Sequence, residues 1–290
     1  MTRIFKTATA LLMGCAMALS CDEYDIAGFV MSTSDNVDRR FATSMEYNEK
    51  HGYQTIRHDS DEYELYVFSD CHLKQEVGTN LKTFTAEYVN ACGNAPAVLF
   101  LGDIVNGKDG WDQFIENTQP LRQYGHLFIT AGNHDLYFGQ WPEYVQRFGT
   151  STYWFEIVCP TVKDLYISLD SGSGTLGTDQ RVWVETILKE KASQYRHVIV
   201  FTHTHFFKVD NRQGHTSNYS MEETYDLLNL FSQYGVELVL TGHKHFYEQQ
   251  NFKGVEYVTV DGLSDDENQS GYIVCKIKND ISIKSLKVSH

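Results

Sequence analysis

The stretch Leu127-Phe128-Ile129-Thr130-Ala131-Gly132-Asn133-His134-Asp135 decides the fold of this 290-residue chain. Its first four residues form an apolar run that is typical of a buried strand. An amide, an imidazole and a carboxylate follow that run directly. Because α/β proteins place their binding sites at the carboxyl ends of strands, the stretch predicts an α/β fold with a chemical site at such an end.

Four further polar motifs repeat this layout along the chain, each after a short apolar run. The runs and their motifs are Leu65–Phe68 with Asp70-Cys71-His72, Val98–Leu101 with Gly102-Asp103, Val198–Phe201 with Thr202-His203, and Leu238–Leu240 with Gly242-His243-Lys244-His245. Oxygen and imidazole ligands at the ends of five strands can converge on one point in space. The pattern therefore predicts a site for two metal ions.

The side chains of these motifs are hard or borderline ligands. Carboxylate or amide oxygens come from Asp70, Asp103 and Asn133, and imidazole nitrogens come from His72, His203, His243 and His245. None of them is a cysteine, so structural zinc of the finger type is a poor match. Each motif alone is mostly chance, and a single histidine is more often a core residue than a ligand. Five motifs in this order make chance a weak explanation.

The set resembles the calcineurin-like metallophosphoesterase superfamily, whose pattern is D-x-H, G-D, G-N-H-D/E, H and G-H-x-H. The motifs span Asp70–His245, and supporting segments extend the resemblance from Tyr63 to Val288. Leu169-Asp170-Ser171 also resembles a strand-to-helix segment of that family. The resemblance implies an α/β fold in which two central mixed β-sheets are flanked by helices, a four-layer α/β/β/α sandwich.

The same resemblance implies a ligand set and an activity. The two ions, Mn, Fe or Zn, would share Asp103 as a bridging ligand. A metal-bridging hydroxide would then hydrolyse a phosphodiester or a phosphomonoester. By position, the first ion is held by Asp70, His72, Asp103 and His245, and the second by Asp103, Asn133, His203 and His243.

Two further residues receive catalytic roles on this resemblance. His134 lies beside a metal ligand and is expected to be the general acid that protonates the leaving alkoxide. Asp135 is expected to orient His134 and to favour its protonated form, as an adjacent carboxylate does.

Differences from the motif patterns of related phosphoesterases narrow the class of enzyme that is expected. In purple acid phosphatases a tyrosine ligand follows the Gly-Asp motif by three residues, whereas this chain has Asn106 there, so a tyrosinate–iron centre is not expected. Family members often have proline two residues after the fourth-motif histidine, whereas this chain has His205. We favour His203 as the ligand because it comes first after the strand, with His205 as the alternative.

The amino terminus predicts export. A short basic start is followed by the apolar stretch Ala8–Leu19, which is too short to span a bilayer and is typical of a secretory signal. Leu19-Ser20-Cys21 resembles a bacterial lipoprotein processing site with Cys21 as the lipidated residue. Processing at Cys15 and cleavage by an ordinary signal peptidase are the alternatives.

The acidic residues after Cys21, Asp22-Glu23-Tyr24-Asp25, resemble the export signal of bacterial surface lipoproteins, although a solvated tether would have the same composition. We therefore expect a membrane-anchored lipoprotein in the periplasm or on the cell surface. The predicted organisation is a lipoprotein-type signal peptide over residues 1–20, a tether and leading segment over 21–60, and a metallophosphoesterase domain over 61–290.

Composition limits the partners. The formal net charge is −14 and becomes −16 when the signal, with Arg3 and Lys6, is removed. This charge disfavours duplex nucleic acid, whose binding requires neutralisation of phosphates by basic side chains. It places no limit on a small phosphoester substrate, which meets the local field of the metal ions. The remaining cysteines are widely spaced and form no disulfide framework or metal motif, and two or more of them are expected to be buried thiols: Cys71, Cys92, Cys159 and Cys275.

Helices and turns fill the intervals between the strands. Helical patterns are predicted over Asn80–Cys92, Gly139–Phe148, Thr178–Tyr195 and Met221–Tyr234. Thr178 is the expected N-cap of the third, whose apolar side includes Val182. Hairpin turns are predicted at 251–254 and 278–280. Residues 22–60 are polar and lack a clear period, so they are predicted to be a tether and a partly ordered leading segment.

The substrate is not readable from the sequence. Candidate specificity elements are the loops 106–109 and 209–215, with Arg212 and His215, and the aromatic residues Tyr137, Phe138 and Trp141. Those aromatic residues either form an apolar wall for a substrate or pack at the start of a helix. A non-catalytic surface-binding lipoprotein that keeps the fold is the alternative function, although a scaffold has no physical need for seven ligands.

Overall fold

The computed structural model describes residues 36–74, 78–91, 95–107, 109–207, 219–266 and 270–288. The predicted signal peptide, Cys15, Cys21 and the acidic tetrapeptide lie outside these ranges. Cys92, Lys108, Arg212 and His215 lie outside them as well.

One sheet has five strands in the order β12-β11-β2-β3-β4. Its parallel part consists of β2 (Tyr63–Phe68), β3 (Ala97–Phe100) and β4 (His126–Ile129). The strands β11 (Gly271–Ile277) and β12 (Ile281–Lys287) extend it in antiparallel fashion beyond β2. All three parallel strands end directly before predicted ligand motifs, so they deliver those motifs to one edge.

The other sheet has seven strands in the order β1-β5-β6-β7-β8-β10-β9. Its centre contains β7 (Val198–Phe201) and β8 (Leu238–Thr241), which pair in parallel and precede the last two motifs. The remaining strands are β1 (Gln54–Arg57), β5 (Tyr153–Val158), β6 (Lys163–Ser168), β9 (Glu248–Phe252) and β10 (Val255–Thr259).

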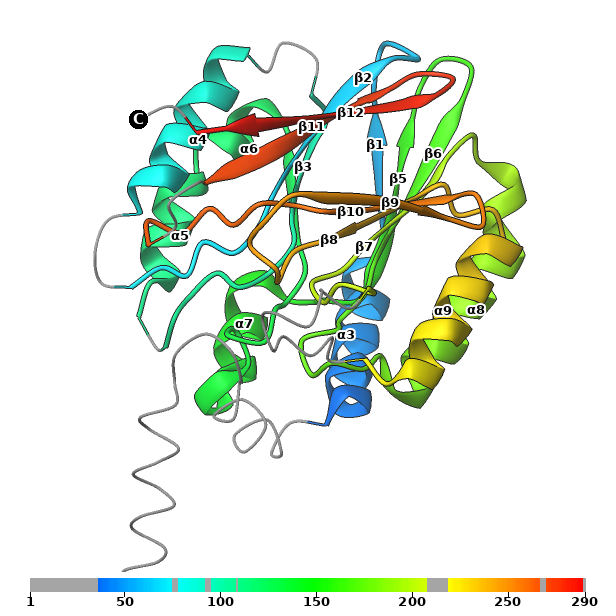
Figure 1. Cartoon of the computed structure of the whole chain (residues 1–290), viewed down its shortest axis with the longest axis horizontal. Helices are drawn as coiled ribbons and strands as arrows, with labels where there is room; N and C mark the ends of the chain where they lie inside the picture. Colours follow the sequence, from blue (N-terminus) through cyan, green and yellow to red (C-terminus); the bar gives the residue numbers. More distant parts are fainter. Residues whose placement is uncertain are drawn as a thin grey trace, which may run out of the picture.

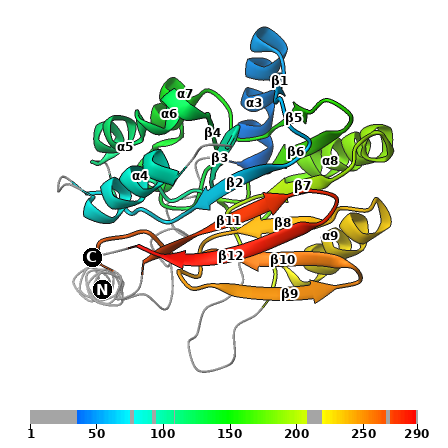
Figure 2. The same cartoon turned by 90° about the horizontal axis from the view of Figure 1, so that it is seen from above.

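The two sheets pack face to face with helices on both outer sides, as Figures 1 and 2 show. Buried side chains of both sheets meet in one apolar cluster, in which the rings of Phe128 and Phe155 stack at 3.6 Å between centroids. Separate apolar clusters join each sheet to its own helices. This is the predicted arrangement of two mixed sheets flanked by helices.

The helices over the five-stranded sheet are α4 (Thr79–Ala91), α5 (Trp111–Thr118), α6 (Leu121–Tyr124) and α7 (Trp141–Phe148). Those over the seven-stranded sheet are α8 (Gly177–Lys191) and α9 (Met221–Gln233). Short 3₁₀ turns are η2 (Tyr137–Gly139) and η3 (Ala192–Gln194). The four predicted helices thus correspond to α4, α7, α8 and α9, whereas α5 and α6 were not predicted.

The leading segment, expected to be only partly ordered, contributes a helix and a strand to the fold. Residues Val37–His51 form helix α3, and β1 pairs in parallel with β5. The buried face of α3 presents Arg40, Ser44 and Asn48 besides Val37. Because polar side chains form most of that face, the helix lacks the apolar period by which amphipathic helices are recognised in a sequence.

Helix α8 corrects two details of the prediction. It begins at Gly177, and its first N–H groups are capped from another element: Asp38 of α3 accepts hydrogen bonds from the backbone of Thr178 (3.0 Å) and Asp179 (3.2 Å). Thr178 is therefore not the N-cap. Val182, expected on the apolar side, is 61% exposed.

The two predicted hairpins are present. Residues 253–254 connect β9 to β10, and residues 278–280 connect β11 to β12. Cys71, Cys159 and Cys275 are buried free thiols, which agrees with the expectation of two or more such thiols. No helix within the described ranges combines the length and the apolar character that crossing a bilayer requires.

Candidate metal centre

The five predicted motifs meet in space. Three follow β2, β3 and β4 of one sheet, and two follow β7 and β8 of the other. Hydrogen bonds join the loops to one another: the backbone N–H of Asp70 donates to the carbonyl of Gly102 (3.0 Å), and that of Gly242 donates to the carbonyl of His203 (2.9 Å). The sheets therefore bring candidate ligands from distant parts of the sequence to one place.

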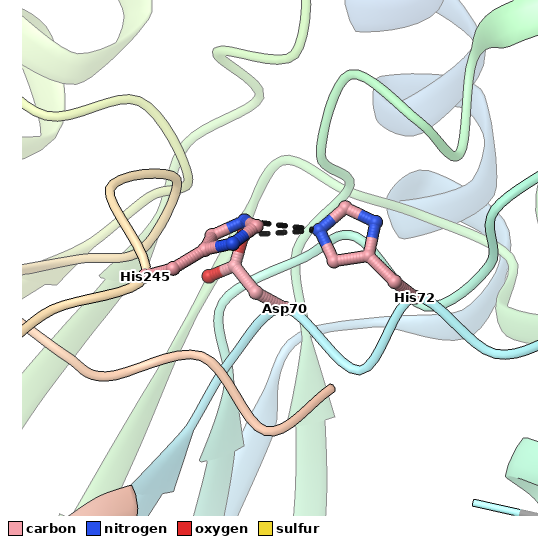
Figure 3. Close-up of side chains that lie close together, drawn as sticks. All are labelled: Asp70, His72 and His245. Atoms are coloured by element: carbon pink, nitrogen blue, oxygen red, sulfur yellow. Dashed lines mark hydrogen bonds and ion pairs between the residues drawn. The ribbon is translucent and has the colours of Figure 1, made fainter. Parts of the chain in front are cut away.

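The first cluster consists of Asp70, His72 and His245, shown in Figure 3. The Nε2 atoms of His72 and His245 lie 3.1 Å apart. The Oδ1 atom of Asp70 lies 3.3 Å from Nε2 of His245 and 3.8 Å from Nε2 of His72. One carboxylate and two imidazoles thus point at a common centre.

The second cluster consists of Asp103, His203 and His243, with Asn133 beside it. The Nε2 atom of His203 lies 3.3 Å from Oδ2 of Asp103, 3.1 Å from Nδ1 of His243 and 3.0 Å from Oδ1 of Asn133. All four side chains belong to the set predicted for the second ion.

Asp103 lies between the two clusters. Its Oδ2 atom is 3.6 Å from Nε2 of His72, a member of the first cluster, and 3.3 Å from Nε2 of His203, a member of the second. The carboxylate is buried. A third group of possible ligand atoms, Asp103 with His72 and His134, overlaps both. This position suits a bridging carboxylate.

Neighbouring groups fix the orientation of the ligands. Nδ1 of His203 is 2.8 Å from the carbonyl oxygen of Leu101. In the tautomer with its proton on Nδ1, the ring donates to this oxygen and Nε2 faces the centre as an acceptor. Nδ2 of Asn133 donates to the hydroxyl of Tyr137 (2.6 Å), which leaves Oδ1 facing the centre. Tyr137 was not predicted in this role, and its place four residues after Asn133 is the only signal in the sequence.

The backbone is strained at the candidate ligands. Among the described residues, left-handed φ angles occur at Asp70 (52°), His72 (45°), Asp103 (60°), His243 (73°) and His245 (58°), and otherwise only at Phe138 and Lys253 besides glycines. This conformation costs a non-glycine residue about 1–3 kcal/mol. Its concentration at the predicted ligands indicates that the surrounding loops enforce the direction of these side chains.

Two motif glycines are required by close approach. A Cβ atom at Gly132 would collide with the Asp103 carboxylate, and one at Gly242 would collide with the Ser69 hydroxyl and the Asp70 carboxylate. Any larger residue would therefore displace a candidate ligand. The glycines belong to the motifs because the loops pack against the ligands.

The charges of the cluster are strongly coupled. Burial would raise the pKa of Asp70, but His245 and His72 hold it well below its usual value. Burial also acts to raise the pKa of Asp103, and His203 and His134 lower it. Burial lowers the pKa of His243 to about 3. Both carboxylates are consequently ionised and the His243 ring is neutral, as metal binding requires.

The residues fit two divalent cations. Two carboxylates, an amide oxygen and four imidazoles are a donor set that manganese, iron and zinc accept. The ligand atoms of each cluster lie within 4.8 Å of one another. Burial lowers the pKa of His203, but Asp103 raises it to about 9, so the ring is protonated and carries a positive charge beside the Asp103 carboxylate. A bound cation would take the place of that charge. The assignment of individual ligands remains a prediction.

The structure corrects the expected role of Asp135. Its buried carboxylate accepts hydrogen bonds from the backbone N–H groups of Asp103 (2.9 Å), Ile104 (2.8 Å) and Gly132 (2.9 Å). It therefore fastens the loop after β3 to the loop after β4 and positions Asp103, and its oxygens are used on the backbone rather than on His134.

His134 is also not held in its protonated form by that carboxylate. Burial lowers the pKa of the ring to about 4. Its Nδ1 atom is buried and has no hydrogen-bond partner among the described residues. The ring packs edge-on against His72, 4.5 Å between centroids, which keeps it at the edge of the cluster.

Other candidates separate clearly. His205 is buried and stacks on His243 at 5.5 Å between centroids, outside the three ligand groups, so the geometry favours His203 as the ligand.

The residues proposed to contact the substrate differ in exposure. Asn106 is exposed. Tyr137 and Trp141 are buried, whereas Phe138 is 46% exposed. Of the possible apolar wall, only Phe138 presents a large surface to solvent.

Comparison with known proteins agrees with this geometry. The family model for the calcineurin-like phosphoesterase matches residues 63–247. The chain is 26% identical over 213 residues to the Fe(3+)-Zn(2+) purple acid phosphatase 12 of Arabidopsis thaliana, covering 62% of this chain and 44% of that protein. The chain thus spans less than half the length of this curated relative.

Solved structures share the fold. A dimetal phosphatase from Danio rerio superposes with a TM-score of 0.61 at 12% identity, covering 78% of this chain and 98% of that chain. A purple acid phosphatase from yellow lupin seeds superposes with a TM-score of 0.58 at 14% identity, covering 79% of this chain and 52% of that chain. The arrangement of two mixed sheets flanked by helices is common to all three.

Proposed function

The chain belongs to the calcineurin-like phosphoesterase family, and on that premise we propose that it hydrolyses phosphoric esters at a site for two divalent cations. The observation that carries the proposal is the position of Asp103, whose Oδ2 atom lies between His72 of one cluster and His203 of the other. A carboxylate in this position suits a pair of ions rather than one.

The predicted ligands divide between the two ions. Asp70, His72 and His245 would hold the first, Asn133, His203 and His243 would hold the second, and Asp103 would join them. Bound divalent cations supply Lewis acidity and a nucleophilic water near neutral pH.

Other residues of the chain orient the predicted ligands and protonate the leaving group. The Leu101 carbonyl and the Tyr137 hydroxyl fix His203 and Asn133. Asp135 holds the Asp103 loop through backbone N–H groups. The His134 ring lies beside His72 and outside the assigned ligands, and we assign to it the delivery of a proton to the leaving oxygen. Because burial lowers its pKa to about 4, this role requires that the bound ester and its negative charge raise that pKa.

The experiment strips the purified protein of metal and reloads it with Mn²⁺, Fe²⁺ or Zn²⁺. Hydrolysis of bis-p-nitrophenyl phosphate is then compared with that of p-nitrophenyl phosphate. Asp103→Ala removes the shared ligand, and Asp226→Asn is the matched control because Asp226 lies exposed on α9, in an ion pair with Arg181.

We expect metal-dependent turnover that Asp103→Ala abolishes and Asp226→Asn preserves, and the preferred ester separates diesterase from monoesterase. Two bound metal ions without turnover of either ester would instead favour the non-catalytic binding lipoprotein.

We further propose that Cys21 carries a lipid anchor that places the protein on an exported membrane surface. The support is the sequence pattern of residues 1–25, which lie outside the described structure. Globomycin, an inhibitor of lipoprotein signal peptidase, should block processing of the precursor; unchanged processing would favour an ordinary signal peptidase.

A further inference from the structure

A file of aromatic rings runs from the candidate metal centre to the molecular surface. The ring of His134 lies 4.5 Å from that of His72 and 4.7 Å from that of Tyr137, between centroids. Tyr137 in turn lies 6.5 Å from Phe138, at an interplanar angle of 87°. The first three rings are largely buried, and the file ends at a phenyl ring that is 46% exposed.

The backbone at Phe138 is strained as it is at the candidate ligands. Its φ of 58° and ψ of 23° are left-handed, which is an outlier for a bulky side chain. Asn or Gly would adopt this conformation with less strain and would not expose an apolar ring. Neither the strain nor the exposure contributes to folding stability, so both point to a functional role.

The place of Phe138 distinguishes it from other exposed apolar residues. In the described part of the chain, none of the other large exposed apolar side chains lies on a loop that carries a candidate ligand: Tyr53, Ile115, Tyr124, Val182, Met221 and Tyr225. Phe138 follows Asn133 by five residues, on the turn whose Tyr137 hydroxyl holds that ligand.

We propose that Phe138 is a stacking platform for the leaving group, so that the substrates are phosphoesters whose leaving group carries an aromatic ring. In this proposal the phosphate lies at the metal centre, and the path of the aryl or heteroaryl leaving group follows the file of rings towards the phenyl face of Phe138. Offset or edge-on contact between aromatic rings then favours such esters over alkyl esters. This inference rests on the proposed function.

Binding of non-hydrolysable phosphonates tests the platform without relying on turnover. Benzylphosphonate and methylphosphonate share a headgroup, and calorimetry on the metal-loaded protein gives the ratio of their affinities. We expect wild type to prefer benzylphosphonate by about tenfold, as one aromatic contact would provide. Phe138→Asn, which tolerates the left-handed backbone, should reduce that preference about fivefold or more.

Two variants control the experiment. Phe138→Tyr keeps the ring and should retain the preference, and Tyr225→Asn removes an exposed ring on α9 and should leave it unchanged. An equal preference in wild type and Phe138→Asn, or no preference in wild type, would overturn the platform while leaving the phosphoesterase intact. Binding of neither phosphonate, with no ester hydrolysed, would overturn the proposed function and the platform together.

Discussion

Arg40 of helix α3 and Asp170, which follows strand β6, form a buried ion pair joined by two hydrogen bonds. Nε donates to Oδ2 at 2.8 Å and Nη2 to Oδ1 at 3.1 Å, and each side chain is 1% exposed. The next residue, Ser171, accepts hydrogen bonds from the Thr202 hydroxyl (2.7 Å) and the Thr204 backbone (2.8 Å), on either side of His203. The leading segment is thus coupled to a candidate metal ligand.

Arg40→Met should destabilise the protein by about 3–5 kcal/mol, because it leaves the Asp170 carboxylate buried without its partner. Urea denaturation followed by circular dichroism measures the change. Arg39→Met is the matched control, since Arg39 is exposed on the same helix. Equal stability of the two variants would show that the pair contributes nothing.

Substitution of the two neighbouring histidines should separate ligand from packing residue. His203→Asn removes the nitrogen that faces Asp103 and should lower the metal content from two ions toward one. His205→Asn should retain two ions, because His205 stacks behind His243. The metal content of each variant is measured by mass spectrometry after gel filtration. Loss of an ion in His205→Asn, with two ions kept in His203→Asn, would make His205 the ligand.

Asp135→Asn should weaken metal binding about 10- to 100-fold, as loss of a group that supports a ligand does. An amide offers one acceptor oxygen where the carboxylate offers two, so part of the hydrogen bonding to the Asp103 loop is lost. Titration with Mn²⁺ gives the affinity. If Asp135 acted through His134, the effect would disappear in a His134→Ala background; we expect it to persist there.

His134→Ala should lower the rate for phenyl phosphate about 10²- to 10⁴-fold, the range for loss of general acid catalysis. The rate for p-nitrophenyl phosphate should fall much less, since that leaving group needs little protonation. Metal content should stay unchanged. An equal loss on both esters, or full activity on phenyl phosphate, would contradict the acid role.

His197 should make stability depend on pH. Burial would lower its pKa, but its hydrogen bonds to Glu237 and to the carbonyl of Lys278 raise it above the usual value. The stabilisation is therefore fully present below about pH 6.5, the pKa of an unfolded histidine, and is lost as pH rises through the folded value.

Thermal unfolding of wild type and His197→Gln across pH 5–9 measures this effect. We expect the difference in melting temperature to be largest at acidic pH and to shrink as pH rises. A constant difference would mean that His197 contributes by packing alone.

The motifs and the central strands were predictable because they are local patterns. The apolar runs before the five motifs correspond to β2, β3, β4, β7 and β8, with ends shifted by at most two residues. Short runs of buried apolar residues followed by polar ligands and glycine carry this information within a few positions of sequence. The motifs converge because the carboxyl ends of β2, β3 and β4 in one sheet lie beside those of β7 and β8 in the other.

Features that depend on distant partners were not predictable. Helix α3 buries the polar residues Arg40, Ser44 and Asn48, whose partners are more than 100 residues away. Its sequence therefore lacks the apolar period that predicts a helix. The cap of α8 comes from Asp38 rather than from Thr178. A buried polar side chain stabilises the fold only where another group forms a hydrogen bond or ion pair with it. In these cases that group lies far away in the sequence.

The sequence by itself thus determined which side chains are candidate metal ligands and which strands precede them, since both are encoded in adjacent residues. Only the tertiary structure decided how those side chains are held. In that structure the Asp135 carboxylate accepts hydrogen bonds from the backbone of the Asp103 loop, the Tyr137 hydroxyl accepts one from Asn133, and Phe138 is exposed. These differences arise because the direction of a side chain is set by loops that pack together from distant parts of the chain.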